Sequence, residues 1–169
     1  MAVKKEVQYC DRKPGDLNES ARLIERVFLA EFDLAFGDRV AREIEEASAA
    51  FDPERDLFTT AELDGIILGT LLVAHDEAAR TEVTKFSWLV VDPAARGRGI
   101  GRELLFRAIE SCRQRRLRLL RARAFALSAA GPRLYWMYGF RVVELLPLIV
   151  AGRSREMVLF EKRLTPAAD

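Results

Sequence analysis

Histidine and cysteine are scarce in this chain of 169 residues. His75 is the single histidine, so neither a histidine-rich metal site nor a Ser-His-Asp triad is easily built. The two cysteines, Cys10 and Cys112, lie far apart and lack the spacing of metal ligands. We interpret them as buried, reduced thiols of a cytoplasmic protein. The sequence therefore predicts a protein without a metal site.

Long hydrophobic runs are also missing. The longest apolar run is interrupted by Pro147, and none approaches the roughly 20 residues that a membrane helix needs. Residues 1–10 lack the apolar core of a secretory signal. Half of the residues are hydrophobic and 31% are charged, which is typical of a globular protein. We expect a single domain over residues 1–169, with no membrane partner.

An excess of either charge is absent overall, because the net charge is only +1, but the two signs are separated along the chain. Residues 16–64 hold 14 acidic and 5 basic residues, whereas residues 96–123 hold 10 arginines against Glu103 and Glu110. Two solvated faces of opposite sign would explain this pattern. So would an anionic ligand on the basic half and a cationic one near the acidic half. A nucleic-acid surface is disfavoured, because the net charge is near zero and alternating arginines usually solvate an exposed strand edge.

Hydrophobic periodicity predicts a mixed, mostly antiparallel sheet with flanking helices, in the order β-α-α-β-β-β-α-β-α-β-β. The predicted strands cover residues 6–10, 57–63, 66–74, 83–91, 117–125, 140–145 and 157–163. The first predicted helix follows a cap at Asp16 and ends at Gly37, and Asp38 begins a second. A third helix buries the face from Ile100 to Cys112, and a fourth covers residues 129–138. Asp64-Gly65 predicts a tight hairpin, because that turn needs positive φ at both positions.

The segment with the clearest chemistry joins the strand 83–91 to the third helix. It reads Val91-Asp92-Pro93-Ala94-Ala95-Arg96-Gly97-Arg98-Gly99-Ile100-Gly101. Amides at a helix N-terminus are unpaired and carry partial positive charge, so they bind phosphate oxygens. The glycines let that backbone approach a bulky anion, and the arginines, including Arg102, add charge. The segment matches neither a P-loop nor the dinucleotide glycine pattern.

Two motifs carry a resemblance to a known family. Arg96-x-x-Gly99-x-Gly101, after a Val-Asp-Pro strand end, resembles the acetyl-CoA pyrophosphate motif of the GNAT superfamily of N-acetyltransferases. The segment from Leu134 to Phe140 resembles the helix-to-strand signature of the same superfamily. The similarity is greatest to the acetyltransferase domains found fused to MarR-type regulators. The resemblance implies the acyl-CoA N-acyltransferase fold and an enzyme that uses acetyl-CoA.

The resemblance also implies roles for individual residues. The backbone of Leu89 and Val91 would bind the pantetheine arm, and the Leu89 N–H would face the thioester oxygen. Tyr135 aligns with the general acid that protonates the departing thiolate. The implied cofactor-binding residues are Leu89, Val90, Val91, Arg96, Gly97, Arg98, Gly99, Ile100, Gly101, Arg102, Ser128 and Tyr135.

Two positions depart from the family pattern. Ser128 stands where the family often has an asparagine, and it retains a hydroxyl that can form a hydrogen bond. Lys85 stands where a general-base glutamate sometimes lies, and an ammonium group cannot serve as that base. Glu82 and Glu31 are two alternative bases. A third alternative is a base that acts through water, or an amine that arrives already neutral.

The expected reaction is direct transfer of acetyl from acetyl-CoA to a primary amine in a ternary complex, because no cysteine lies near the motif to act as a nucleophile. The alternative is a non-catalytic acyl-CoA-binding regulatory module. The acceptor is expected to be a small molecule or a peptide. The acidic residues 16–64 favour an acceptor with net positive charge. A homodimer is expected, and no nucleic-acid partner.

Overall fold

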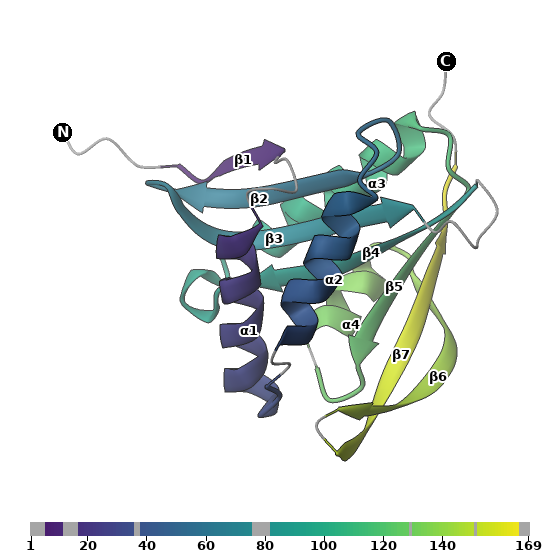
Figure 1. Cartoon of the computed structure of the whole chain (residues 1–169). Helices are drawn as coiled ribbons and strands as arrows, with labels where there is room; N and C mark the ends of the chain where they lie inside the picture. The colour runs from purple at the N-terminus through teal and green to yellow at the C-terminus, as the bar shows by residue number, and fades with distance from the viewer. Residues whose placement is uncertain are drawn as a thin grey trace.

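The computed structural model describes residues 6–11, 17–35, 38–75, 82–128, 130–150 and 152–165. In these ranges the chain forms a seven-stranded sheet in the order β1-β2-β3-β4-β5-β7-β6 (Figure 1). The strands are β1 (Gln8–Asp11), β2 (Leu57–Leu63), β3 (Ile66–His75), β4 (Val83–Val91), β5 (Leu119–Phe125), β6 (Arg141–Val150) and β7 (Arg153–Arg163). The helices are α1 (Asn18–Phe32), α2 (Asp38–Ala49), α3 (Ile100–Gln114) and α4 (Ala130–Met137), with a short 3-10 turn η2 (Pro93–Ala95).

Only the β4–β5 pair is parallel among the described strands, and the other neighbours are antiparallel. The predicted order of elements and the mixed, mostly antiparallel sheet are therefore confirmed. The Asp64-Gly65 hairpin is confirmed as well, since both residues have positive φ, at 53° and 79°.

Two helix layers enclose the sheet. Helices α1 and α2 lie on one face and α3 and α4 on the other (Figure 1). The predicted face of α3 is buried in the larger core; it consists of Ile100, Leu104, Leu105, Ala108, Ile109 and Cys112. The smaller core on the other face joins α1 and α2 to Phe58, Ile67, Leu72 and Val90 of β2, β3 and β4. No β5 residue belongs to that smaller core as described, but α1 packs on the end of β5, where the rings of Phe28 and Phe32 lie 5.8 and 5.4 Å from that of Phe125. The part of β5 before Phe125 is left uncovered on this face by α1 and α2, and Arg121 and Arg123 are exposed there.

Some boundaries differ from the prediction. Helix α1 ends at Phe32, before Gly37, because Asp33 adopts a left-handed conformation (φ 51°) and donates its N–H to the Leu29 carbonyl. The predicted cap Asp16 and the predicted stop Gly37 lie outside the described residues. Strands β6 and β7 are longer than predicted and pair through Pro147, which an edge strand tolerates because its missing N–H breaks no second ladder.

The prediction that the arginines of residues 118–123 lie on an exposed strand edge is wrong. Strand β5 lies between β4 and β7 in the sheet. Arg121 and Arg123 are exposed nevertheless, because they point to the face that α1 and α2 leave uncovered. Both cysteines are free thiols, Cys112 buried and Cys10 half-buried. No helix in the described ranges is long and apolar enough to cross a membrane.

Candidate active site

The site begins where β4 separates from β5. The two strands pair only from Val83 to Phe86, opposite Leu119 to Ala122. On its other side, β4 carries a bulge, because Thr70 pairs with Val90 whereas Leu72 pairs with Ser87. Trp88 lies in this bulge with a φ of 56°, which is a strained conformation for a bulky side chain. The backbone from Ser87 to Val91 therefore faces a gap instead of a neighbouring strand.

The turn after β4 is shaped by its glycines. Asp92 caps η2 by accepting the Ala94 N–H at 2.9 Å, and Gly99 is the N-cap of α3. Gly97 and Gly99 have φ values of 78° and 80°, and a Cβ at either position would meet nothing within 4 Å. These positions thus require glycine for conformation and not for space. The first amides of α3 have no intrahelical acceptor and carry partial positive charge, which is an arrangement suited to an anion.

Helix α1 holds this turn through two ion pairs. Arg26 Nη2 lies 2.5 Å from Asp92 Oδ2, and Glu31 pairs with Arg96. Arg96 also donates to the Val91 carbonyl from Nε at 3.4 Å and Nη2 at 3.3 Å. The Arg96 guanidinium is therefore anchored within the protein. Arg98 and Arg102 differ from it, because both are exposed and neither side chain forms an ion pair with a described residue.

A cleft of about 950 Å³ contains the gap, the turn and part of the uncovered sheet face. It brings together most of the predicted site residues. Those that line it are Leu89, Val90, Val91, Arg96, Gly97, Gly99, Ile100, Gly101, Arg102, Ser128 and Tyr135. Arg98 and Glu82 are not among its lining residues.

Tyr135 reaches the cleft from α4 and is almost fully buried. Its ring packs edge-on against Phe86 and Phe160, with centroids 5.3 and 5.2 Å away, and the tilted ring of Phe140 lies 5.7 Å away. Burial raises the pKa of the Tyr135 hydroxyl far above its ordinary value. The hydroxyl is therefore protonated at neutral pH, so it can donate a proton and cannot act as a base.

The two glutamates considered as bases, and the lysine at the position where the family sometimes has one, occupy different places. Glu82 precedes β4, and its side chain is half exposed and pairs with Arg118 at 3.3 Å, away from the cleft. Glu31 and Lys85 both line the cleft. Of the two glutamates considered as bases, only Glu31 therefore reaches the cleft, and there it is paired with Arg96.

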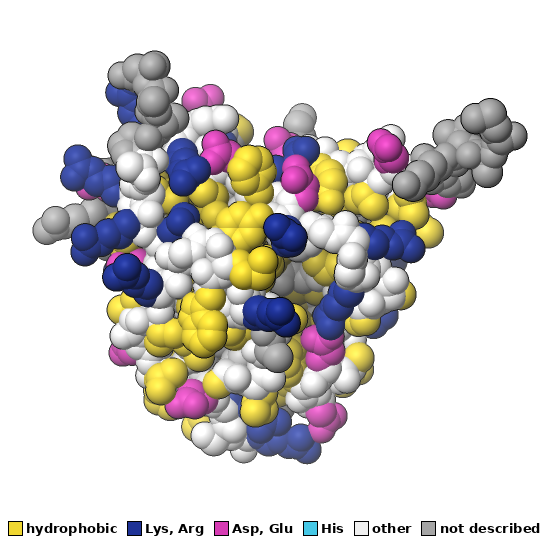
Figure 2. Space-filling model, turned by 180° about the vertical axis from the view of Figure 1, so that it is seen from behind, with side chains coloured by type: hydrophobic (Ala, Val, Ile, Leu, Met, Phe, Trp, Pro, Cys, Tyr) yellow, Lys and Arg dark blue, Asp and Glu magenta, His cyan; other side chains and the backbone are white. Residues whose placement is uncertain are grey.

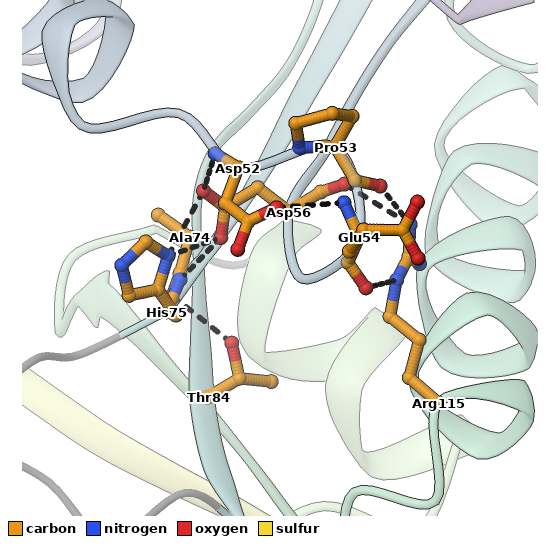
Figure 3. A network of polar contacts seen from close by, with 8 residues as sticks. All are labelled: Asp52, Pro53, Glu54, Asp56, Ala74, His75, Thr84 and Arg115. Carbon is orange, nitrogen blue, oxygen red and sulfur yellow. Dashed lines mark hydrogen bonds and ion pairs between the residues drawn. The ribbon is translucent and has the colours of Figure 1, made fainter.

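Sequence reasoning missed a buried pair at another part of the cleft wall, formed by Asp56 and His75 (Figure 3). Asp56 is 3% exposed, and its Oδ1 lies 2.8 Å from His75 Nδ1 and accepts the His75 backbone N–H at 2.7 Å. The Thr84 hydroxyl donates to the Ala74 carbonyl at 3.0 Å, so it is not aligned as a nucleophile for this imidazole. Nothing in the spacing of these residues indicates that β3 brings them together.

Arg115 completes this network from the end of α3 (Figure 3). Its guanidinium donates to the backbone carbonyls of Pro53, Glu54 and Asp56 at 2.9 to 3.2 Å. The network therefore fastens the loop before β2 to α3, and we assign it a structural role.

The arginines between residues 113 and 123 do not act as one basic stripe. Arg113, Arg118 and Arg121 pair with Glu110, Glu82 and Glu161 respectively. On the face opposite to that of Figure 1, Lys and Arg side chains are dispersed among hydrophobic and acidic ones (Figure 2). Within the described part of the chain, no three His, Cys, Asp or Glu side chains are grouped to hold a metal ion.

Comparisons with known proteins agree with this architecture. A model of the acetyltransferase (GNAT) family matches residues 22–140, a range that contains both the glycine-rich turn and Tyr135. The yncA protein of Salmonella typhimurium, determined with its cofactor acetyl-CoA, is 20% identical, with 97% of each chain covered and a TM-score of 0.77. An N-acetyltransferase from Staphylococcus aureus Mu50 is 19% identical, covers 95% of this chain and 99% of its own, and has a TM-score of 0.76.

A third structure is the ribosomal-protein-alanine N-acetyltransferase from Brucella melitensis. It is 21% identical over 93% of this chain and 99% of its own, with a TM-score of 0.73. No curated protein sequence gives a significant match. At these identities the structural neighbours show a shared fold.

Proposed function

Because the chain belongs to the GNAT family of acetyltransferases, we propose that it transfers an acetyl group from acetyl-CoA to a primary amine, by direct attack in a ternary complex. The observation that carries this proposal is the gap between β4 and β5, which runs from the glycine-rich turn to the buried Tyr135. An anion site and a proton donor are thus joined by one cleft.

The residues around the gap fit acetyl-CoA. The amides from Gly97 to Arg102 would hold the pyrophosphate, with charge supplied by Arg98 and Arg102. The backbone of Leu89 and Val91, which has no neighbouring strand on the β5 side, would bind the amides of the pantetheine arm. Ser128 lines the same cleft with a hydroxyl that can form a hydrogen bond. Acetyl-CoA bound to the yncA protein supports this assignment.

The proposed chemistry depends on two fixed groups. The Leu89 N–H would stabilise the carbonyl oxygen as it gains negative charge during attack by the amine, and a backbone donor in this role is worth several kcal/mol. Tyr135, whose hydroxyl burial keeps protonated, would give its proton to the departing thiolate. We favour Glu31 over Glu82 as the group that receives the amine proton, directly or through water, because only Glu31 lines the cleft.

Direct attack is favoured over a covalent acetyl-enzyme. No cysteine is among the residues that line the cleft, since Cys10 lies on the edge strand β1 and Cys112 is buried on α3. A serine or threonine nucleophile would need an adjacent base, and Thr84 donates to a backbone carbonyl instead.

The test combines calorimetric titration with acetyl-CoA and a screen of amines that measures release of free CoA thiol. We expect binding of acetyl-CoA and turnover with at least one amine. The alternative, a non-catalytic acyl-CoA-binding module, predicts binding without transfer in single-turnover experiments. Absence of acetyl-CoA binding would contradict both.

A further inference from the structure

Three cationic side chains lie together on the floor of the cleft, on the sheet face that α1 and α2 leave uncovered. Lys85 of β4 is directly opposite Arg121 of β5, and Arg123 follows on the same face because strand side chains alternate. All three are exposed and line the cleft. Neighbouring strands are about 4.8 Å apart, so this register places like charges side by side.

The fold compensates one of these three charges and leaves the other two without an ion pair to a described residue. Arg121 is paired with Glu161 at 3.1 Å. Lys85 and Arg123 form no hydrogen bond or ion pair with any described residue. Like charges on adjacent strand positions destabilise a sheet, so a concave site that keeps two unpaired cations beside a third favours an anionic occupant.

This group of cationic side chains is separate from the glycine-rich turn. Lys85 lies in the part of β4 that still pairs with β5, before the bulge at Trp88. The turn follows the other end of β4, after Val91. From Lys85 to Leu89 the strand advances four residues, which is about 13 Å at most. An anion held by Lys85 and Arg123 would therefore belong to a second substrate whose amine reaches the bulge.

The acidic residues of α1 and α2 oppose this charge less than their number suggests. Glu31, Glu43 and Glu46 line the cleft. Glu31 is paired with Arg96 and Glu43 with Arg39, at 2.9 Å in the second case. Only Glu46 of these three has no ion pair with a described residue. The argument for an acceptor with net positive charge is weakened accordingly.

We propose that the acceptor carries an anionic group, a carboxylate or a phosphate, in addition to its amine, and that Lys85 and Arg123 bind this group. The proposal rests on the proposed acetyl transfer and specifies the class of its acceptor. It also gives a role to Lys85, which stands where the family sometimes has a base. The Arg123 fork suits bidentate contact with either anion, and Lys85 adds a second point charge.

The test is a comparison of acceptors that differ only in this group. Linear ω-amino acids of two to six carbons are compared with their amides, with aminoalkyl phosphates and with diamines, at equal concentrations of neutral amine. We expect kcat/KM to be at least 10-fold higher for the best acid or phosphate than for its uncharged counterpart, as one charge-assisted hydrogen bond provides. Whether the acid or the phosphate is preferred identifies the anion.

Two variants connect the preference to the residues. Lys85→Gln and Arg123→Gln should each reduce the preference for the anionic acceptor about 10-fold. Arg163→Gln is the matched control, because Arg163 is an exposed strand arginine that does not line the cleft. It should leave the preference unchanged. A preference that persists when Lys85 and Arg123 are both replaced, or amides and diamines that react as well as acids, would overturn the proposal.

Binding is measured as well, so that failure of the proposed acetyl transfer can be distinguished from failure of the proposed anion site. The acids and amides are titrated calorimetrically into protein saturated with CoA. One outcome is that acids bind more tightly than amides and lose that advantage in Lys85→Gln, but no acetyl transfer occurs. This outcome would sustain the anion site and overturn the proposed acetyl transfer. Transfer that does not discriminate between acids and amides would sustain the enzyme and overturn the anion site. The absence of any preference for acids, in binding and in transfer alike, would also overturn the anion site.

Discussion

Tyr135 is the residue on which the proposed chemistry depends most directly. If its hydroxyl protonates the thiolate, Tyr135→Phe should lower kcat by about 100-fold or more, with little change in the affinity for acetyl-CoA. Burial raises the pKa of this hydroxyl above its ordinary value of about 10, so the acid form persists at alkaline pH. The value of kcat should therefore rise with pH as the amine loses its proton, and it should show no decline at any pH up to 10.

The matched control is Tyr9→Phe. Tyr9 is a half-buried tyrosine on β1 that does not line the cleft, and its hydroxyl should be dispensable. An effect of less than threefold for Tyr135→Phe, or a similar loss in Tyr9→Phe, would reduce Tyr135 to a packing residue. Steady-state kinetics and calorimetry on the same preparations provide both numbers.

Cys112 is a second single residue with a testable effect, because it makes the free energy of unfolding depend on pH. Burial in the larger core raises the pKa of its thiol to about 12, so the unfolded chain loses this proton at a lower pH than the folded chain does. The free energy of unfolding should therefore fall as pH rises above about 9. The contribution of this one group between pH 8 and pH 10.5 is roughly 2 kcal/mol.

Urea denaturation at pH 8, 9.5 and 10.5 measures this fall. Cys112→Ala should be less stable at every pH because it leaves a cavity, but its stability should decline less steeply with pH. Equal slopes in the two proteins would show that Cys112 does not contribute.

At the scale of elements, the turn between β4 and α3 is the part that we propose binds the pyrophosphate. Gly99→Glu places a carboxylate where the anion would lie, and we expect it to abolish detectable binding of acetyl-CoA in calorimetry. The substitution also strains the backbone, because Gly99 has a φ of 80°. Gly65→Glu is the matched control, since Gly65 has a φ of 79°, equally open surroundings and a place in the β2–β3 hairpin. The Gly65→Glu variant should lose a similar amount of stability and keep its affinity for acetyl-CoA.

The contact between β3 and α3 sets the position of that turn. A Cβ on Gly69 would lie 2.9 Å from Ile100 Cγ2 and 3.3 Å from the Val90 carbonyl oxygen, so α3 would have to move. Gly69→Ala should destabilise the protein by about 1–3 kcal/mol, as overpacking usually does, and should weaken acetyl-CoA binding. At Gly101 a Cβ would make ordinary contacts at 3.5 and 3.6 Å, so Gly101→Ala should cost no stability in the same melts. A neutral effect of Gly69→Ala would contradict the tight packing.

At the scale of the whole molecule, the expected homodimer can form through β6, the longer of the two edge strands of the described sheet. Strand β6 is an edge strand of ten residues and exposes Val142, Val143, Leu145 and Ile149. Unpaired apolar edges of this length favour pairing with a second strand, and a twofold axis joins two copies of the same edge. We predict twice the chain mass in light scattering at micromolar concentration, and the single mass for the variant that combines Val143→Lys with Ile149→Lys. A monomeric wild type, or a dimer that survives both substitutions, would refute this arrangement.

The sequence by itself determined the elements and their order. Hydrophobic periodicity is local, so the buried face of α3 and the strand 83–91 could be read from residue spacing. The glycine-rich turn was recognisable for the same reason, because positive φ and a helix N-terminus are properties of a few consecutive residues. The predicted end of a strand was wrong where pairing with a neighbouring strand determines it. Strand β6, for example, continues beyond Pro147 because it pairs with β7.

Only the tertiary structure decided which side chains share the cleft. The register of β4 against β5 sets Lys85 beside Arg121, and the bulge at Trp88 opens the gap beyond them. Ion pairing decided which charged side chains could bind a ligand. Arg96 is paired with Glu31, whereas Arg123 has no ion-pair partner among the described residues. Register and pairing join residues far apart in the chain, and their energies depend on distances that residue spacing does not contain.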